Sequence, residues 1–367
     1  MTRALAAPLA AVLLVVLAAC ASPAPTPTPT AEPATPTPTA ASGPLTCDDV
    51  ASLDTVAAAL TRADLVAPTP VVAVQPSSAF DTALLRGAGG LACSWRAGEG
   101  QLVEGSGDGE WAYVQVSILP GAAAQYAPVW AGDAPSTETR DVGEVTASTA
   151  EGETGWVLSA PVGDAWVQVA LRASGLTGDS SFFEGVAPGA VGDAVADVAS
   201  EVFAAIDGAA PERLTWPALT PRSGDAACTG GLDESGIVSA LQVDPSSVLD
   251  YAVVDARATA PDSFESAVAS AAGVFTCDLR TDGAGSATIA VVRGFASELD
   301  VMRSEPDTSS AFSDLPLEGA VEGEGAIVAN RSDGPASPVY LTVGDTLYQV
   351  YSDGAEAVAE AIIAQTR

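Results

Sequence analysis

The sequence contains no histidine and no lysine among its 367 residues, and only five cysteines. Without histidine there is no imidazole base near neutral pH, no histidine metal ligand and no Ser-His or Cys-His nucleophile pair. Without lysine, Schiff-base chemistry and Ser-Lys pairs are excluded as well. Composition therefore removes most hydrolase active sites and predicts a protein that is not an enzyme, with no catalytic residue and no cofactor.

Positive charge is also scarce, with 14 arginines against 47 acidic residues and a net charge of −33. Such a surface repels nucleic acid and anionic lipid headgroups, so neither is a predicted partner. Solubility explains the charge most simply, and attraction of a divalent cation or a basic partner is the alternative. The length suits two domains of ordinary size, and 48% hydrophobic residues are enough for a folded core.

The N-terminus has the pattern of an export signal. Arg3 precedes an apolar run at residues 4–17, which is shorter than the ~20 residues that a membrane-spanning helix needs. The run ends in Leu-Ala-Ala-Cys at residues 17–20, which resembles the lipobox of bacterial lipoproteins. This resemblance implies a signal peptide at residues 1–19, a lipid on Cys20 and attachment to the extracytoplasmic face of the cell membrane. Lipidation also accounts for the odd number of cysteines.

Residues 20–44 form a segment rich in proline and threonine. Such a segment cannot bury a core and favours extended polyproline II, as expected of a stalk. Together with the absence of lysine, this stalk resembles those of envelope lipoproteins from actinobacteria.

The rest of the chain predicts two copies of one module. "VGDAWVQV" at 162–169 is nearly repeated by "VGDTLYQV" at 343–350. "VAAAL" at 56–60 and "IVSAL" at 237–241 follow Cys47 and Cys228 at the same offset. Three blocks in one order indicate an internal repeat, with modules at 45–207 and 226–367 and a linker at 208–225.

A further match lies upstream of the second cysteine of each copy. Phe80-Asp81 precedes Cys93, and Phe264-Glu265 precedes Cys277, by the same thirteen and twelve residues. Gly89 and Gly273 fall in register as well.

Each module predicts an α+β fold, an antiparallel sheet packed with helices. An opening helix follows the first cysteine, with one apolar face made of Val50, Leu53, Val56, Ala57 and Leu60. Short helices are expected near residues 80 and 264 and near 122 and 296, and a last helix closes each module. The second cysteine of each module lies in a strand.

Four cysteines remain after lipidation. They lack the close Cys-x2-Cys pairs of zinc sites, so no metal is predicted, and an exported protein meets an oxidising environment. Four cysteines allow three pairings, and only Cys47–Cys93 with Cys228–Cys277 keeps both bonds inside a repeat.

With "CSW" at residues 93–95, this pattern resembles the two-cysteine domains of uncharacterised actinobacterial lipoproteins. Related folds include the PsbP-like sandwich and the external sensor domains of some actinobacterial kinases. The resemblance carries no agreed activity, so it implies no catalytic residue.

Two kinds of candidate site remain. Gly163-Asp164 and Gly344-Asp345 have the chemistry of tight hairpin turns, and the alternative of paired carboxylates has no partner base nearby. Gln168 and Gln349 follow in alternating strands, where bonds to backbone or solvent are expected.

Tryptophans are concentrated in the first module, and aromatic clusters line sugar or lipid pockets. Trp95, Trp111 and Trp166 are therefore the predicted ligand contacts, with core packing as the alternative. The leading hypothesis is a lipid-anchored binding or accessory protein whose partner is a small molecule, a lipid or an envelope protein. The alternatives are a carboxylate-dependent envelope hydrolase of glycosidase type and a structural or sensory spacer.

Overall fold

A computed structural model describes residues 43–60, 71–72, 79–98, 111–152, 155–173, 183, 185–221, 234–244, 249–281, 285–304, 312–329 and 338–365. The predicted signal peptide, Cys20, the stalk up to residue 42 and Cys228 lie outside these residues. Residues 42–367 form one compact unit. Among the described residues, no helix combines the length and the hydropathy that crossing a bilayer requires.

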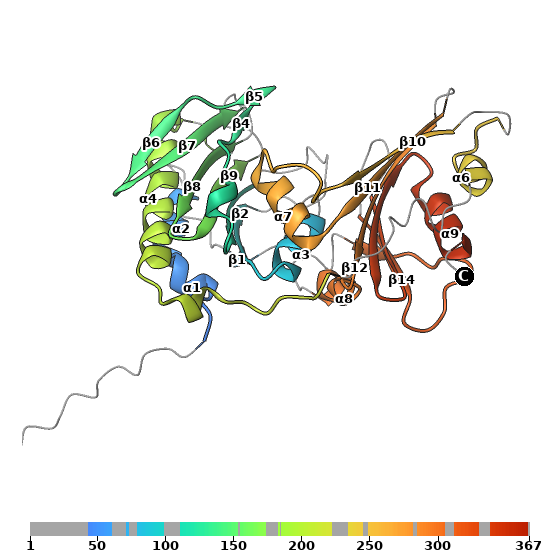
Figure 1. Cartoon of the computed structure of the whole chain (residues 1–367). Coiled ribbons are helices and arrows are strands. Elements are labelled where there is room, and N and C mark those ends of the chain that lie inside the picture. Colours follow the sequence, from blue (N-terminus) through green and yellow to red (C-terminus); the bar gives the residue numbers. More distant parts are fainter. Residues whose placement is uncertain are drawn as a thin grey trace, which may run out of the picture. The chain divides into compact units, whose positions relative to one another are not determined.

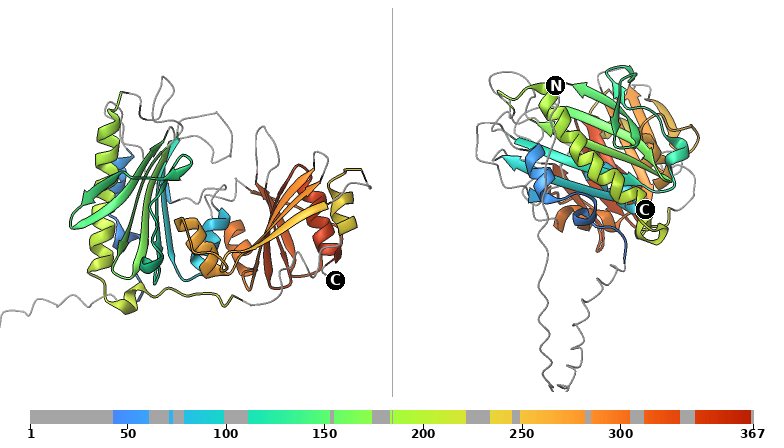
Figure 2. Two further views of the ribbon diagram at one scale, coloured as in Figure 1. Left: turned by 45° about the horizontal axis from the view of Figure 1, so that its top comes forward. Right: turned by 90° about the vertical axis from the view of Figure 1, so that its left-hand side faces the viewer.

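In its described residues, the first half of this unit is a seven-stranded antiparallel sheet with four α-helices. In spatial order its strands are β1 (Val71–Val72), β2 (Leu91–Gly98), β3 (Trp111–Leu119), β9 (Ala165–Ala173), β8 (Gly155–Val162), β7 (Val145–Gly152) and β6 (Thr139–Val142). The helices are α1 (Cys47–Val50), α2 (Leu53–Ala59), α3 (Ala79–Gly87) and α4 (Pro188–Asp207). The α4 helix runs along one face of this sheet (Figure 1, Figure 2).

The second half has a seven-stranded sheet of the same kind. Its strands follow the order β10 (Leu249–Asp255), β11 (Phe275–Thr281), β12 (Ser286–Arg293), β16 (Thr346–Ser352), β15 (Val339–Val343), β14 (Gly325–Ala329) and β13 (Phe312–Asp314). Its helices are α6 (Glu234–Ala240), α7 (Phe264–Ala272), α8 (Ser297–Ser304) and α9 (Ala355–Gln365). Strand for strand, the two sheets have the same order along the chain and in space, and both halves are α+β as predicted.

The two "VGD" segments occupy equivalent hairpins, β8–β9 and β15–β16. Gly163 and Gly344 have φ of 59° and 61°, the left-handed region that glycine adopts at low cost. The carbonyl of Asp164 accepts a hydrogen bond from Ala123 N at 3.0 Å, and that of Asp345 accepts one from Gly294 N at 2.8 Å. The prediction of turns is confirmed, and each turn also holds the segment that follows β3 or β12.

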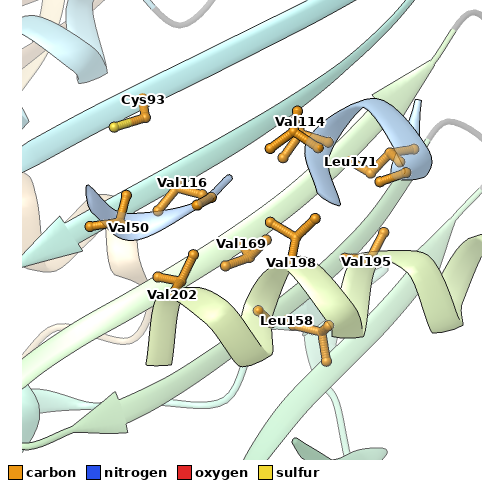
Figure 3. Packing of buried hydrophobic residues seen from close by; sticks show 14 of the residues in the cluster. Val50, Cys93, Val114, Val116, Leu158, Val169, Leu171, Val195, Val198 and Val202 are labelled. Atoms are coloured by element: carbon orange, nitrogen blue, oxygen red, sulfur yellow. The ribbon is translucent and has the colours of Figure 1, made fainter. Parts of the chain in front are cut away.

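The core of the first half lies between its sheet and the helices α1, α2 and α4. Branched apolar residues of α4 recur every three or four positions and pack on alternate residues of β3, β8 and β9, as Figure 3 shows. The members drawn there include Val195, Val198 and Val202 from α4 and Val114, Val116, Leu158, Val169 and Leu171 from the strands.

A disulfide joins Cys47 to Cys93, as predicted, and ties α1 to β2. Cys277 is also disulfide-bonded. Its predicted partner, Cys228, lies outside the described residues. In the second half, α6 and α9 pack on the sheet in the same way.

Two sequence-based expectations are corrected by the structure. The opening helix is broken at Ala51-Ser52, and the Ser52 hydroxyl caps a new helix by accepting a bond from Thr55 N. Leu53 is therefore 54% exposed instead of lying on the buried face with Val56. Helices of the same kind were expected near residues 122 and 296, but only the second half has an α-helix there, α8. The first half has a single 3-10 turn (η2, Ala123–Gln125) at the equivalent place.

A separate apolar cluster joins the two halves. Phe80 of α3 stacks on Tyr340 of the second sheet with ring centroids 6.3 Å apart, and Phe264 of α7 meets Trp166 of the first sheet edge-on at 5.7 Å. Each half thus places one helix against the sheet of the other half, and α3 packs on α7.

An ion pair from Arg86 of α3 to Glu298 of α8, 2.9 Å long, lies beside this cluster. The linker also contributes, because Leu219 N donates to the carbonyl of Gly87 and Trp216 Nε1 donates to the carbonyl of Leu45.

Candidate functional site

A polar pocket of about 160 Å³ lies where α3 and α7 meet the first sheet. Its floor comes from alternate residues of β3 and β9, which share one face of the sheet. Three cross-strand pairs supply this floor: Tyr113 with Arg172, Gln115 with Ala170, and Ser117 with Gln168. The next pair, Leu119 with Trp166, belongs to the apolar cluster between the halves, so the pocket begins where that cluster ends.

The walls come from two helices, α3 and α7. On α3 they are Asp81, Thr82 and Leu85, and on α7 Phe264, Glu265 and Val268. Asp81 and Glu265 occupy the positions that the repeat aligns, one residue after Phe80 and Phe264. The pocket thus requires both halves of the chain.

The electrostatics of the pocket centre on these two acids. Removal from water, and then the negative charge of Glu265, raise the pKa of Asp81 to about 6. By solvent accessibility, however, the Asp81 and Glu265 side chains are both exposed, so water screens their interaction and the rise in the pKa of Asp81 is an upper limit. Both causes act in the same direction, so the Asp81 carboxyl is easier to protonate than an ordinary aspartate.

Tyr113 stays protonated at physiological pH. Burial raises its pKa to about 12, although the nearby Arg172 guanidinium, which hydrogen-bonds to it, acts in the opposite direction. Its hydroxyl is therefore a hydrogen-bonding group and not a base.

Two hydroxyls of the pocket lack partners. The Thr82 and Ser117 side chains are each only 5% exposed, and both line the pocket. Neither has a side-chain hydrogen bond to any residue that the structure describes. Their oxygens are not among the fully enclosed polar atoms that lack a partner, so water or a ligand in the pocket can bond to them.

The predicted tryptophans do not gather into one site. Trp95 and Trp166 are each 1% exposed, the former in the core beneath α1, α2 and α4 and the latter in the cluster between the halves. Trp166 Nε1 donates to Ser159 Oγ at 2.7 Å. Trp111 lies on β3 opposite Gly98, and its side chain lies outside the description. Trp95 and Trp166 therefore have the packing role given as the alternative.

Sequence reasoning missed the residues that do converge. Gln168 was expected to bond backbone or solvent, yet it lies in the pocket floor. The available signal was the aligned Phe-Asp and Phe-Glu pairs, which place acids at equivalent positions of two helices.

A second hollow, of about 670 Å³, lies at the Gly163-Asp164 turn beside Trp216 of the linker. Glycine, alanine and proline make up eight of its fourteen lining residues, and few polar side chains converge there. Among the described residues, no group of three or more acids and cysteines is arranged to hold a metal ion. The pocket between α3 and α7 is therefore the better candidate.

Comparison with known protein families, with curated proteins and with solved structures finds no match to this chain.

Proposed function

We propose that the chain is an exported, lipid-anchored envelope protein that binds a small polar ligand in the pocket between α3 and α7, without chemical conversion. The observation that supports this most directly is a polar pocket into which Thr82 and Ser117 bring hydroxyls that have no hydrogen-bond partner among the described residues. Hydrogen-bonding groups left open by the protein are what a ligand site provides. The sequence pattern at residues 1–44 supports the location, through a lipid on Cys20.

The proposal treats the halves as two copies of one module, bounded at 45–207 and 226–367. Support comes from the shared strand order and from the matching turns at Gly163 and Gly344. The aligned helix positions support it too, because Phe80 and Phe264 are 4% and 5% exposed and contribute to one cluster. Duplication then explains why two acids from equivalent positions face one pocket.

The test is calorimetric titration of the full chain in detergent with small amines, amino acids and monosaccharides. Gln168→Leu should abolish binding, because it removes an amide from the pocket floor. Gln349→Leu is the matched control, since Gln349 holds the equivalent position on the second sheet. Equal loss in both variants, or no binding by any class of compound, would contradict the proposal.

A second candidate is the carboxylate-dependent hydrolase, which the elevated pKa of Asp81 beside Glu265 favours. A general acid at neutral pH needs such a carboxyl. The pocket argues against it, since 160 Å³ is below the ~300 Å³ typical of ligand clefts and too small for a glycan chain. Hydrolysis of an envelope glycan that is lost in both Asp81→Asn and Glu265→Gln would establish this alternative.

A further inference from the structure

We propose that the pocket selects a small primary amine, whose ammonium group binds between Asp81 and Glu265. The inference rests on the proposed binding function and names the chemical class of the ligand.

The two carboxylates have no cationic partner in the described part of the chain. Neither has an ion pair or a side-chain hydrogen bond there. Arg86, on the same helix as Asp81, is paired with Glu298 of α8. Acids in the first turn of a helix are common because they face the positive end of its dipole. These two also face each other, and Glu265 is close enough to Asp81 to disfavour its charge.

The pocket's one arginine is drawn away from these acids. Arg172 interacts with Tyr113, two residues along β9 from Ala170 and four from Gln168. Its Nη1 would lie 2.8 Å from a Cβ placed on Gly155, which shows that its side chain leans over β8. It has no influence on the pKa of Asp81. An ammonium ion from outside supplies the missing positive charge.

The remaining groups of the pocket suit an ammonium ion. An –NH₃⁺ group donates three hydrogen bonds and accepts none. The carboxylates accept two, and the unpartnered hydroxyls of Thr82 and Ser117 offer further acceptors. Leu85 and Phe264 add apolar walls for a short carbon chain. At ~30 Å³ per water, the cavity holds the volume of about five waters, which fits an amine of few carbons.

The affinity should depend on pH. Asp81 is charged above about pH 6, so a cation binds less well as the pH falls through that value. If only the ionised form binds, a pKa near 6 lowers the affinity at pH 5 about tenfold relative to pH 7.5. The other charged groups that line the pocket are Glu265 on α7 and Arg172 on β9, whose guanidinium is directed to Tyr113 and β8, and Tyr113 stays neutral over this range.

The experiment is calorimetric titration of the full chain in detergent with propylamine, with 1-propanol as the uncharged match and tetramethylammonium as a cation without donors. We expect propylamine to bind at pH 7.5 and the two others not to. Asp81→Asn and Glu265→Gln should each weaken binding at least tenfold, and Asp81→Asn should also remove the pH dependence. Asp133→Asn and Glu322→Gln, which remove the same charge at exposed acidic residues, are the controls and should leave binding unchanged.

The outcomes separate this inference from the proposed function. If propylamine and tetramethylammonium bound equally, or if the test and control variants had equal effects, binding would be general attraction of cations by an acidic protein. Either result would overturn the inference. Binding of a sugar that depends on Gln168 but not on Asp81 would overturn it and leave the binding function standing. Titration of vesicles with ethanolamine headgroups distinguishes a lipid-borne amine from a free one. Absence of binding by every probe would overturn both proposals.

Discussion

Gly87→Ala is the most direct test of how the two halves meet. Gly87 is the last residue of α3, and a Cβ at this position would lie 2.0 Å from Cε1 of Phe295. Carbon atoms that are not bonded to each other never approach so closely, so the ring or the helix must move. Phe295 is fully buried in the cluster between the halves, so its ring has no free space to enter.

The magnitude follows from two opposing effects. Insertion of a methyl group into a packed core costs about 1–3 kcal/mol. Replacement of glycine by alanine near the end of a helix offsets up to ~1 kcal/mol of this. The net expectation is a loss of about 1–2 kcal/mol, which lowers the melting temperature by several degrees in a chain of this size.

Gly189→Ala is the matched control, because Gly189 also lies in a helix and a Cβ there would meet no atom within 4 Å. It should leave stability unchanged or raise it slightly. Urea denaturation followed by circular dichroism measures both variants. If Gly87→Ala were as stable as Gly189→Ala, α3 would not pack on Phe295, and the pocket that depends on this packing would lose its wall.

Three further predictions concern other contacts. Replacing both Cys47 and Cys93 by serine should lower the free energy of unfolding by about 4 kcal/mol, the loop-closure entropy expected for a disulfide that spans 46 residues. Urea denaturation measures this loss, and an unchanged midpoint would contradict the bond. Glu298→Ala should cost about 1–3 kcal/mol, because it removes two charged hydrogen bonds from Arg86 beside the cluster between the halves; a loss no larger than that of Glu322→Ala, at an exposed acid, would contradict this. Cys20→Ala should move the protein from the membrane fraction to the soluble fraction, and retention in the membrane would contradict lipidation.

Much of the fold is predictable from local and repeated patterns. The Gly-Asp pairs predict the hairpins because glycine is needed where φ is positive, and the spacing of Cys47 and Cys93 predicts their bond from the logic of the repeat. The break at Ser52 was missed because a helix-capping serine competes with an apolar stripe that would continue through it. The sequence shows Val50 and Leu53 at helical spacing, but the cap rotates Leu53 into solvent.

The pocket was not predictable in the same way. Asp81 and Glu265 occupy aligned positions in the sequences of the two halves. Their proximity in the structure, however, depends on the packing of α3 against α7. No periodicity within one helix encodes that contact. The number of tryptophans in the first half does not locate a ligand site, because large buried rings also stabilise sheets and interfaces.

The two halves differ at equivalent positions of their sheets, and these differences bear on the pocket. Trp166 and Ser159 of the first sheet correspond to Leu347 and Tyr340 of the second, so the large aromatic residue has changed strands while the pair keeps a similar total volume. Trp166 still meets Phe264, and Tyr340 still meets Phe80.

Further along the same strands the correspondence ends. Ala170, which leaves room for the pocket floor, is matched by Tyr351, whose side chain is 47% exposed. Gln115 and Ser117 are matched by Thr288 and Ala290, which offer fewer hydrogen-bonding groups. The face of the second sheet has thus lost the small residue and the polar row that shape the first. The polar lining of the shared interface therefore comes mainly from the first half of the chain, and α7 of the second half provides a wall.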